Sequence, residues 1–338
     1  MATAKPTIAL RRDREAAHGV ALESLAHAHG SSTTPNPGTP LDLSIIRAQR
    51  VNRSAVERRA GTLESGRAVT KQSQAEWLLR AITLMDLTTL AGDDTPAVVR
   101  RLCAKAQRPL PAKLLAALGA SKPPIHVAAV CVYHAFVPTA VKALEGSGIP
   151  VAAVSAGFPA GLSPFKLRVA EVRESVAAGA REIDIVIMRA HVLTGDWAAL
   201  YDEVRAFREA AGDALLKAIL ATGELKTLTN VARASHVCMM AGADFIKTST
   251  GKEAVNATLP AGLVMCRAIR EHHQRTGFAA GLKPAGGIRT AKQALDWMAM
   301  VKEELGQNWL RPELFRLGAS TLLGDIERQL ERAVPGRS

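Results

Sequence analysis

The chain has 338 residues, 48% of them hydrophobic, enough to bury a sizeable core in one large domain or two ordinary ones. Its formal net charge of +12 could suit nucleic acid, an anionic membrane or a phosphorylated substrate. The basic residues form no long block, and an aromatic content of 4% is too low for base-stacking platforms. We therefore expect no nucleic-acid partner.

The cysteines and the apolar runs indicate a cytoplasmic protein without a membrane partner. The four cysteines lie far apart, with no spacing typical of a zinc site. Each stands among apolar residues, as reduced core thiols do. No apolar run follows the opening residues, and the most apolar stretch, 127–141, is broken by a histidine and a proline, well short of a membrane span.

Two segments precede the main pattern. Residues 1–39 carry no organised apolar pattern and end in a run of Pro, Ser, Thr and Gly. Such a run buries too little to offset its ordering entropy, so this segment is predicted to be a disordered tail. Over residues 40–80 apolar side chains recur at three- and four-residue spacing, which predicts an N-terminal helical extension.

One pattern then repeats eight times over residues 81–334: a short apolar run, turn residues and an amphipathic helical stretch. The strand candidates are 82–88, 126–133, 151–156, 182–188, 215–222, 244–250, 281–287 and 314–320. Their spacing is that of a βα unit with its return loop. Helices fit between them, for instance 163–178, with an expected Ser163 cap before Pro164, and 290–305, closed by Gly306.

Eight alternating units over roughly 250 residues match the size of a TIM (β/α)8 barrel. An open doubly wound sheet would also alternate strands and helices. Its dinucleotide-binding form places GxGxxG after the first strand, whereas Leu-Ala-Gly-Asp-Asp-Thr (90–95) stands here. The sequence therefore predicts an α/β fold, a TIM (β/α)8 barrel with an N-terminal helical extension.

Ionisable residues interrupt five of the apolar strand candidates. They are Asp86, Asp184, Lys217, Lys247 and Lys283. Buried parallel strands are ordinarily apolar because both of their faces are covered. One such residue could be a strand-end side chain that reaches water, but five near the C-terminal halves of their strands stand where this fold carries its active site. Because an unpaired buried charge costs several kcal/mol, we expect these groups to be paired and functional.

Two of these lysines, Lys247 and Lys283, lie on adjacent strands and suggest covalent catalysis by an amine. An ordinary lysine, of pKa about 10.4, is almost all ammonium at pH 7 and cannot attack a carbonyl. Burial and a neighbouring cation both lower that pKa, which is how a Schiff-base lysine is prepared. Lys247 lies deeper in its apolar run and is the candidate nucleophile, with Lys283 as its perturbing neighbour. Asp184 is the candidate proton carrier.

A second group of residues follows the last strands, where barrels bind phosphate with backbone N–H groups and the positive end of a short helix. A Gly-Gly pair alone is only a turn signal. Its place after strand seven, beside Gly-Ala-Ser-Thr (318–321) at the end of strand eight, predicts a phosphorylated small-molecule substrate. The predicted phosphate-binding residues are Gly251, Lys252, Gly286, Gly287, Arg289, Gly318, Ser320 and Thr321.

No convincing metal site is found in the sequence. The nine histidines lie mostly in expected helices or in the tail, and His126 and His134, which flank strand two, have no evident partners. No His-x-His or HExxH pattern stands at a strand end. We therefore expect neither a metal nor a cofactor.

From about Leu41 onward the chain resembles the deoxyribose-phosphate aldolases, especially their long animal-type form. The most specific motifs are Leu-Met-Asp-Leu-Thr-Thr-Leu (84–90), Asp-Phe-Ile-Lys-Thr-Ser-Thr-Gly-Lys (244–252) and Lys-Pro-Ala-Gly-Gly-Ile-Arg (283–289). The resemblance implies a metal-free class I aldolase. Such an enzyme reversibly cleaves 2-deoxy-D-ribose 5-phosphate to acetaldehyde and D-glyceraldehyde 3-phosphate through a lysine Schiff base, in deoxyribose phosphate catabolism.

By position, the resemblance implies that Lys247 is the Schiff-base lysine, Lys283 the second lysine and Asp184 the proton-transferring aspartate. The residues expected to contact the substrate are Asp86, Thr88, Cys131, Lys217 and Thr250. Two alternatives remain: a Schiff-base aldolase with another donor, such as dihydroxyacetone, and a catalytically silent basic barrel that binds polyanions. The oligomeric state stays open, a homo-oligomer included.

Overall fold

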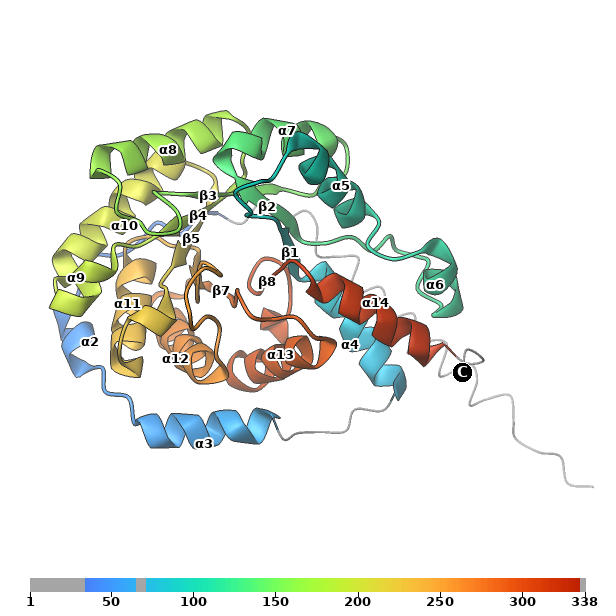
Figure 1. Ribbon diagram of the computed structural model, residues 1–338. Coiled ribbons are helices and arrows are strands. Elements are labelled where there is room, and N and C mark those ends of the chain that lie inside the picture. The colour runs from blue at the N-terminus through green and yellow to red at the C-terminus, as the bar shows by residue number, and fades with distance from the viewer. Residues whose placement is uncertain (1–33, 65–70, 335–338) are drawn as a thin grey trace, which may run out of the picture.

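Eight parallel strands form one sheet, ordered β7-β6-β5-β4-β3-β2-β1-β8, in a computed structural model that describes residues 34–64 and 71–334. Figure 1 looks along the ring of strands, with helices around its outside. The strands are β1 (Met85–Thr88), β2 (Ala129–Tyr133), β3 (Val151–Ser155), β4 (Glu182–Val186), β5 (Leu215–Ile219), β6 (Phe245–Lys247), β7 (Gly281–Lys283) and β8 (Leu317–Ala319). The predicted TIM (β/α)8 barrel is confirmed.

The ring closes between β7 and β8 through isolated parallel bridges, which join Leu282 to Phe315 and Ala285 to Gly318. Each strand lies within its predicted range but is shorter, because the turn residues at the strand ends belong to loops. Lys247 and Lys283 are consequently the last residues of β6 and β7. Both stand at the mouth of the barrel, where loops can enclose a substrate.

Helices cover the outside of the ring. They are α5 (Pro96–Gln107), α6 (Ala112–Ala117), α7 (Val137–Ala143), α8 (Phe165–Ala177), α9 (Arg189–Thr194), α10 (Trp197–Ala211), α11 (Leu228–Met240), α12 (Leu259–Thr276), α13 (Ala291–Leu305) and α14 (Leu322–Ala333). Short 3-10 turns are η1 (His134–Phe136), η2 (Thr222–Glu224) and η3 (Gln307–Trp309). None of the described helices is long and apolar enough to cross a membrane.

The predicted helix ends are correct for α13 and wrong for α8. Thr290 caps α13 in a reciprocal capping box with Gln293, and Gly306 follows its last turn. On α8 the N-cap position belongs to Pro164, whose ψ of 133° is extended, and no side chain caps the helix. Ser163 therefore lies outside the helix and cannot satisfy its first N–H groups.

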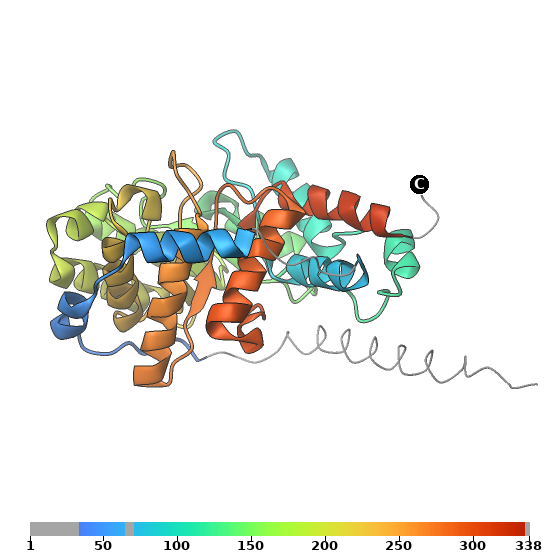
Figure 2. The same ribbon diagram turned by 90° about the horizontal axis from the view of Figure 1, so that it is seen from below.

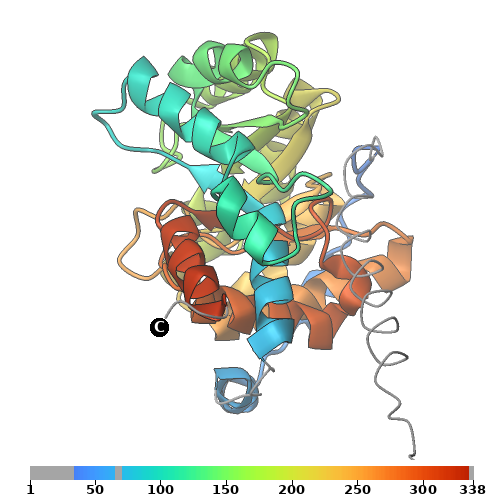
Figure 3. The same ribbon diagram turned by 90° about the vertical axis from the view of Figure 1, so that its right-hand side faces the viewer.

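The N-terminal helical extension consists of α2 (Leu43–Ala48), α3 (Arg53–Glu64) and α4 (Lys71–Thr83). Figure 2 shows α3 lying along the outside of α12 and α13, and Figure 3 shows α4 beside α14. The extension lies against the side of the barrel formed by α11, α12, α13 and α14. Its last helix leads directly into β1.

The segment at 34–39, which was predicted to belong to a disordered tail, is instead packed against the foot of the barrel. Asn36 is buried. Its side-chain amide donates to the carbonyls of Met239 and Ala243, and its backbone N–H donates to Asp244. These satisfied polar groups hold the segment in place. The prediction for residues 1–33 lies outside the described residues.

Strand alternation separates two buried environments, because successive side chains point to opposite faces. On β4, Ile183 and Ile185 join the main hydrophobic core between strands and helices. Asp184 lies between them in the chain and faces the inside of the ring. A separate small apolar cluster of Cys131, Ala152 and Val154 lies on β2 and β3.

Candidate active site

The barrel interior contains seven buried charged side chains at neighbouring heights. Strand register pairs Asp184 with Lys217 and Lys247 with Lys283. The charged set consists of Asp86, Glu182, Asp184, Lys217, Lys247, Lys283 and Arg316. Its members form ion pairs with one another, which confirms the expectation that the charges in the strands are paired.

Asp184 is the centre of this cluster, because its carboxylate contacts three lysines. The side-chain nitrogens of Lys247 and Lys283 both donate to its Oδ2 atom, at 2.8 Å and 2.7 Å. Lys217 donates to the other oxygen, Oδ1, at 2.9 Å. The two candidate catalytic amines therefore lie side by side on one carboxylate oxygen.

Two members of the cluster, Glu182 and Arg316, were not singled out from the sequence. Arg316 bridges Asp86 and Glu182, with contacts of 2.6 Å and 2.7 Å. Glu182 also pairs with Lys217, and Asp86 pairs with Lys283 at 2.5 Å. The alternation of strands could have revealed Glu182, since it stands two residues before Asp184 and so shares its face.

The charges in this cluster do not balance. Four cationic side chains face three carboxylates among the described residues of the interior. An uncompensated charge in such surroundings costs several kcal/mol. The loss of one proton from one lysine removes the excess.

The lysine that most readily loses its proton is Lys247. Burial lowers its pKa, Lys283 lowers it further, and Asp184 acts in the opposite direction without prevailing. Burial also opposes the charge of Lys283, but Asp184 and Asp86 raise the pKa of that lysine. The pair thus combines an amine that loses its proton more readily than an ordinary lysine, Lys247, with one that holds its proton more firmly, Lys283.

The same surroundings keep the central carboxylate ionised. Burial favours the protonated form of Asp184, but Lys217, Lys247 and Lys283 hold its pKa well below the ordinary value. Lys217 is also kept charged: against the effect of burial, Asp184 and Glu182 raise its pKa. Asp184 therefore stays a carboxylate in contact with all three amines.

The other expected substrate contacts line the mouth. Thr88 and Cys131 are register partners on β1 and β2. The hydroxyl of Thr88 donates to its own strand, at the carbonyl of Asp86. Thr250 is buried in the loop after β6. The structure thus brings Cys131 and Thr88 together on one side of the mouth.

The loops after β6, β7 and β8 meet where the phosphate site was predicted. Gly286 and Gly287 have positive φ angles of 81° and 83°, which glycine adopts without strain. A Cβ atom on Gly251 would lie 3.9 Å from the Cα atom of Gly286, so two of the loops are in contact. Thr321 is the N-cap residue of α14, and Ser320 beside it is exposed.

Backbone donors at this place are open. Within the described residues, the N–H groups of Gly286, Gly287 and Ser320 make no hydrogen bond to the protein. Arg289 is exposed, and the amine of Lys252 donates instead to the carbonyl of Leu90, at 2.8 Å. The open N–H groups could receive an anion.

The amide of Gly251 is engaged by the protein itself, unlike those of the glycine pair. Its N–H and that of Thr250 donate to the carboxylate of Glu253, at 3.1 Å and 3.0 Å. The side chain of Glu253 is 2% exposed and lies 3.7 Å from Arg189. An internal carboxylate thus occupies part of the predicted phosphate-binding group.

Gly318 is needed for steric reasons. A Cβ atom there would lie 2.8 Å from the Cβ atom of Ala285 and 3.3 Å from the Cε atom of Lys283. The stem of Lys283 runs along this glycine, so Gly318 helps to place the second lysine.

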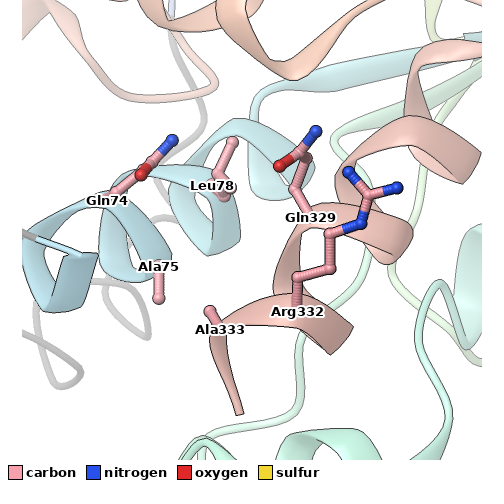
Figure 4. A pocket seen from close by; sticks show the side chains of 6 residues that line it. All are labelled: Gln74, Ala75, Leu78, Gln329, Arg332 and Ala333. Carbon is pink, nitrogen blue, oxygen red and sulfur yellow. The ribbon is translucent and has the colours of Figure 1, made fainter. Parts of the chain in front are cut away.

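Other features of the described residues lie apart from this cluster. No group of three or more His, Cys, Asp or Glu side chains there could hold a metal ion. A cavity of about 200 Å³ opens between α4 and α14 (Figure 4). Its lining residues are Gln74, Ala75, Leu78, Gln329, Arg332 and Ala333. None of them belongs to the charged cluster.

Comparison with known proteins identifies the family to which this barrel belongs. Residues 80–323 match the family described as DeoC/LacD family aldolase, and the chain belongs to this family and is a lyase. It is 60% identical over 304 residues to the deoxyribose-phosphate aldolase of Homo sapiens, covering 89% of this chain and 96% of that protein. The corresponding enzyme of Bos taurus is 58% identical over 302 residues. The resemblance noted in the sequence is confirmed.

Solved structures support the fold. The deoxyribose phosphate aldolase of Aeropyrum pernix, described as a tetramer, superposes with a TM-score of 0.58 at 20% identity, covering 79% of this chain and 99% of that one. A second structure, named QR15 and described as an aldolase, has a TM-score of 0.59 at 23% identity and covers 75% of this chain and 96% of that one. At these identities the likeness concerns the barrel architecture alone.

Proposed function

We propose that the chain cleaves 2-deoxy-D-ribose 5-phosphate reversibly to acetaldehyde and D-glyceraldehyde 3-phosphate through a Schiff base on Lys247. One observation carries the proposal: Lys247 and Lys283 share one oxygen of Asp184, with the pKa of the first lowered and that of the second raised. A neutral amine beside an ammonium is what carbinolamine formation and dehydration require. The choice of substrate rests on the names of the relatives and on the backbone N–H groups after β7 and β8 that have no partner in the described residues.

The first half of the reaction forms and uses an electron sink. The Lys247 amine attacks the C1 aldehyde, and loss of water gives an iminium ion. A base then takes the proton of the C3 hydroxyl group, and the C2–C3 bond breaks. Its electrons pass into the iminium to give an enamine, and D-glyceraldehyde 3-phosphate leaves.

The second half of the reaction regenerates the free amine of Lys247. Carbon C2 of the enamine takes up a proton, and water hydrolyses the new iminium to acetaldehyde and free Lys247. Asp184 and a water molecule move these protons, because this carboxylate is ionised and lies against both amines. The ammonium group of Lys283 lies 2.7 Å from Asp184 and is the nearby proton donor in these steps.

The phosphate group of the substrate is proposed to bind at the N-terminus of α14 and at the Gly286–Gly287 turn. The open N–H groups of these residues and of Ser320 support this placement. Lys252 would exchange its bond to the Leu90 carbonyl for a phosphate oxygen, and Arg289 would add charge. Gly318 and Thr321 shape the turn.

We further propose a role in deoxyribose phosphate catabolism and a cytoplasmic location. All four cysteines are free and buried, which suits a reducing compartment. Residues 81–334 form the proposed catalytic domain and 40–80 its helical extension. No metal or cofactor enters this chemistry.

Borohydride trapping tests the proposal. The protein is incubated with acetaldehyde and borohydride, and the modified peptide is identified by mass spectrometry. We expect a reduced adduct on Lys247 and none in Lys247→Ala. An adduct on Lys283 alone would reverse the assignment of the two lysines, and no adduct at all would favour a catalytically silent barrel.

Substrate choice needs a separate measurement. Acetaldehyde and dihydroxyacetone are compared as aldol donors toward D-glyceraldehyde 3-phosphate. Faster turnover with acetaldehyde is expected. A preference for dihydroxyacetone would keep the Schiff base and discard the proposed substrate.

A further inference from the structure

The loop after β6, residues 248–258, is folded around one buried carboxylate, that of Glu253. Its oxygens accept hydrogen bonds from the backbone N–H group of Thr250, at 3.0 Å and 3.1 Å, and from that of Gly251, at 3.1 Å. The Glu253 side chain is 2% exposed. A carboxylate buried to this degree needs donors and a nearby positive charge, because burying it alone costs several kcal/mol.

The positive charge comes from Arg189, the first residue of α9. Its guanidinium group lies 3.7 Å from the carboxylate of Glu253 and 2.8 Å from that of Glu224, in the η2 turn after β5. The same group donates to the carbonyls of Pro159 and Ala160, which follow β3. Arg189 stands after β4, so its side chain joins the loops that follow four consecutive strands.

The turn that Glu253 holds carries Lys252, a proposed ligand of the substrate phosphate. The backbone N–H of Lys252 donates to the hydroxyl group of Thr250 at 3.0 Å. Its amine extends to the carbonyl of Leu90, in the loop after β1, at 2.8 Å. Because Glu253 fixes Thr250 and Gly251, it also fixes the backbone that directs the Lys252 side chain across the mouth.

Glu253 is linked in a second direction to the glycine turn after β7. Its backbone carbonyl accepts a hydrogen bond from the side-chain amide of Asn256, at 2.8 Å. Asn256 packs against Gly286, since a Cβ atom on that glycine would lie 2.7 Å from the Asn256 Oδ1 atom. The N–H of Ala257 donates to the Gly286 carbonyl, at 3.3 Å. The folded loop thus supports two parts of the proposed phosphate site, Lys252 and Gly286.

A carboxylate beside a phosphate site repels the ligand unless a cation cancels its charge. Arg189 provides that cation for Glu253. The carboxylate also occupies the N–H group of Gly251. The donors left for phosphate at this place are the N–H groups of Gly286 and Gly287, which have no partner among the described residues.

We infer that Glu253, neutralised by Arg189, is a positioning residue of the phosphate site, which shapes the loop after β6 so that Lys252 and Gly286 can meet the substrate phosphate. The identity of that substrate rests on the proposed function. In this role Glu253 touches neither the substrate nor the reacting amine. Its loss should therefore weaken the binding of phosphorylated ligands and spare the reaction of Lys247 with acetaldehyde, which carries no phosphate.

Glu253→Ala tests this role in the full-length chain. KM for 2-deoxy-D-ribose 5-phosphate should rise about tenfold while kcat stays near the wild-type value, because the lost interactions serve substrate and transition state alike. Borohydride trapping of acetaldehyde on Lys247 should keep its rate, which also shows that the barrel is folded. The matched control is Glu209→Ala: this carboxylate pairs with Arg205 on the surface of α10, and its loss should change neither quantity.

Acetate should restore the variant. Glu253→Ala removes a group of the size of acetate and leaves two N–H groups and Arg189 around the vacated space. Sodium acetate should lower the KM of the variant toward the wild-type value. Sodium chloride at the same concentration screens charge equally and should not. A general folding defect would not respond to a carboxylate in particular.

Titration calorimetry with inorganic phosphate separates this inference from the proposed reaction. In the substrate-free protein, Glu253→Ala should weaken phosphate binding about tenfold, or about 1.4 kcal/mol, and acetate should recover it. This measurement does not depend on cleavage of a sugar. A wild type that traps no acetaldehyde would remove the proposed function and leave the phosphate measurement in force.

The contrary outcomes are specific. Unchanged KM and unchanged phosphate affinity in Glu253→Ala overturn the inference, while trapping on Lys247 would still support the proposed function. Loss of trapping along with phosphate binding also overturns it, because Glu253 would then support the whole mouth. A KM that responds to acetate no more than to chloride excludes the carboxylate as the positioning group, and a wild type that binds no phosphate excludes the site.

Discussion

Lys247 and Lys283 donate to the same oxygen of Asp184, one from the end of β6 and the other from the end of β7. Because both amines contact this oxygen, they lie close enough for the charge on one lysine to change the pKa of the other. Burial and the Lys283 ammonium lower the pKa of Lys247. The reactivity of one amine thus depends on the protonation of its neighbour.

Replacing Lys283 with Met should move the activity to higher pH. The neutral form of Lys247 is the reactive one, so the trapping rate rises as pH increases through the pKa of that amine. Without the neighbouring ammonium this pKa is higher, and the rise comes later. Single-turnover trapping with acetaldehyde between pH 6 and pH 10 should show at least a tenfold loss at neutral pH. An unshifted profile would contradict the coupling.

Asp184→Asn should separate Schiff-base formation from turnover. Asp184 raises the pKa of Lys247, so its loss leaves the amine neutral and able to form an adduct. The amide cannot move protons, and turnover should fall by about a hundredfold or more. Parallel measurement of borohydride trapping and kcat checks this. Unchanged kcat would remove the proton-carrying role.

Arg316→Met should destabilise the fold, because it removes the buried ion pairs of Arg316 with Asp86 and Glu182 and leaves these carboxylates with the lysines alone. Breaking a buried pair costs about 3–5 kcal/mol. Adding Glu182→Gln should recover part of that loss in urea unfolding. The matched control, Arg328→Met at the exposed pair with Asp325, should change the free energy of unfolding by less than about 1 kcal/mol.

Gly318→Ala should impair the enzyme through Lys283. The added methyl group would lie 2.8 Å from the Cβ atom of Ala285, well below ordinary contact, and 3.3 Å from the Cε atom of Lys283. Overpacking of this kind costs about 1–3 kcal/mol. We expect lower kcat with a lower melting temperature. Gly324→Ala on α14 is the control: its nearest neighbour would be 3.7 Å away, and kcat should be unchanged.

Acid should destabilise the protein through a buried histidine far from the mouth. Burial, with His236, His273 and Arg275, lowers the pKa of His272 from 6.5 to about 4. As the pH falls from 6.5 to about 4, His272 binds a proton in the unfolded chain but stays neutral in the folded one. The free energy of unfolding therefore falls by at most about 3 kcal/mol. Urea unfolding from pH 7 to pH 4 should show this decline, and His272→Leu should reduce its slope. An equal slope in both proteins would refute it.

Much of the site was predictable from the sequence because its charged side chains stand in strands that are ordinarily apolar in this fold. A lysine or aspartate inside an apolar parallel strand needs a partner, and only other strands at the same height can provide one. Lys217, Lys247, Lys283, Asp86 and Asp184 were found in this way. Eight alternating apolar and amphipathic stretches likewise predicted the barrel.

Other features depend on contacts between distant segments, which no local pattern encodes. Arg316 stands one residue before β8, where charged residues are ordinarily solvated. The carboxylate of Glu253 accepts hydrogen bonds from the N–H groups of Thr250 and Gly251, and this contact depends on the path of the loop after β6. Asn36 lies in a Pro-Gly-rich segment typical of disorder, yet its amide is satisfied by carbonyls about two hundred residues away.

The surplus of one basic side chain over the carboxylates has an energetic consequence for the covalent intermediates. With Lys247 unprotonated the interior is neutral, and the iminium returns to it the positive charge that the free amine had lost. The enamine carries no such charge. In the proposed mechanism we therefore expect the interior to favour the enamine over the iminium once the proton released in the bond scission has left for solvent.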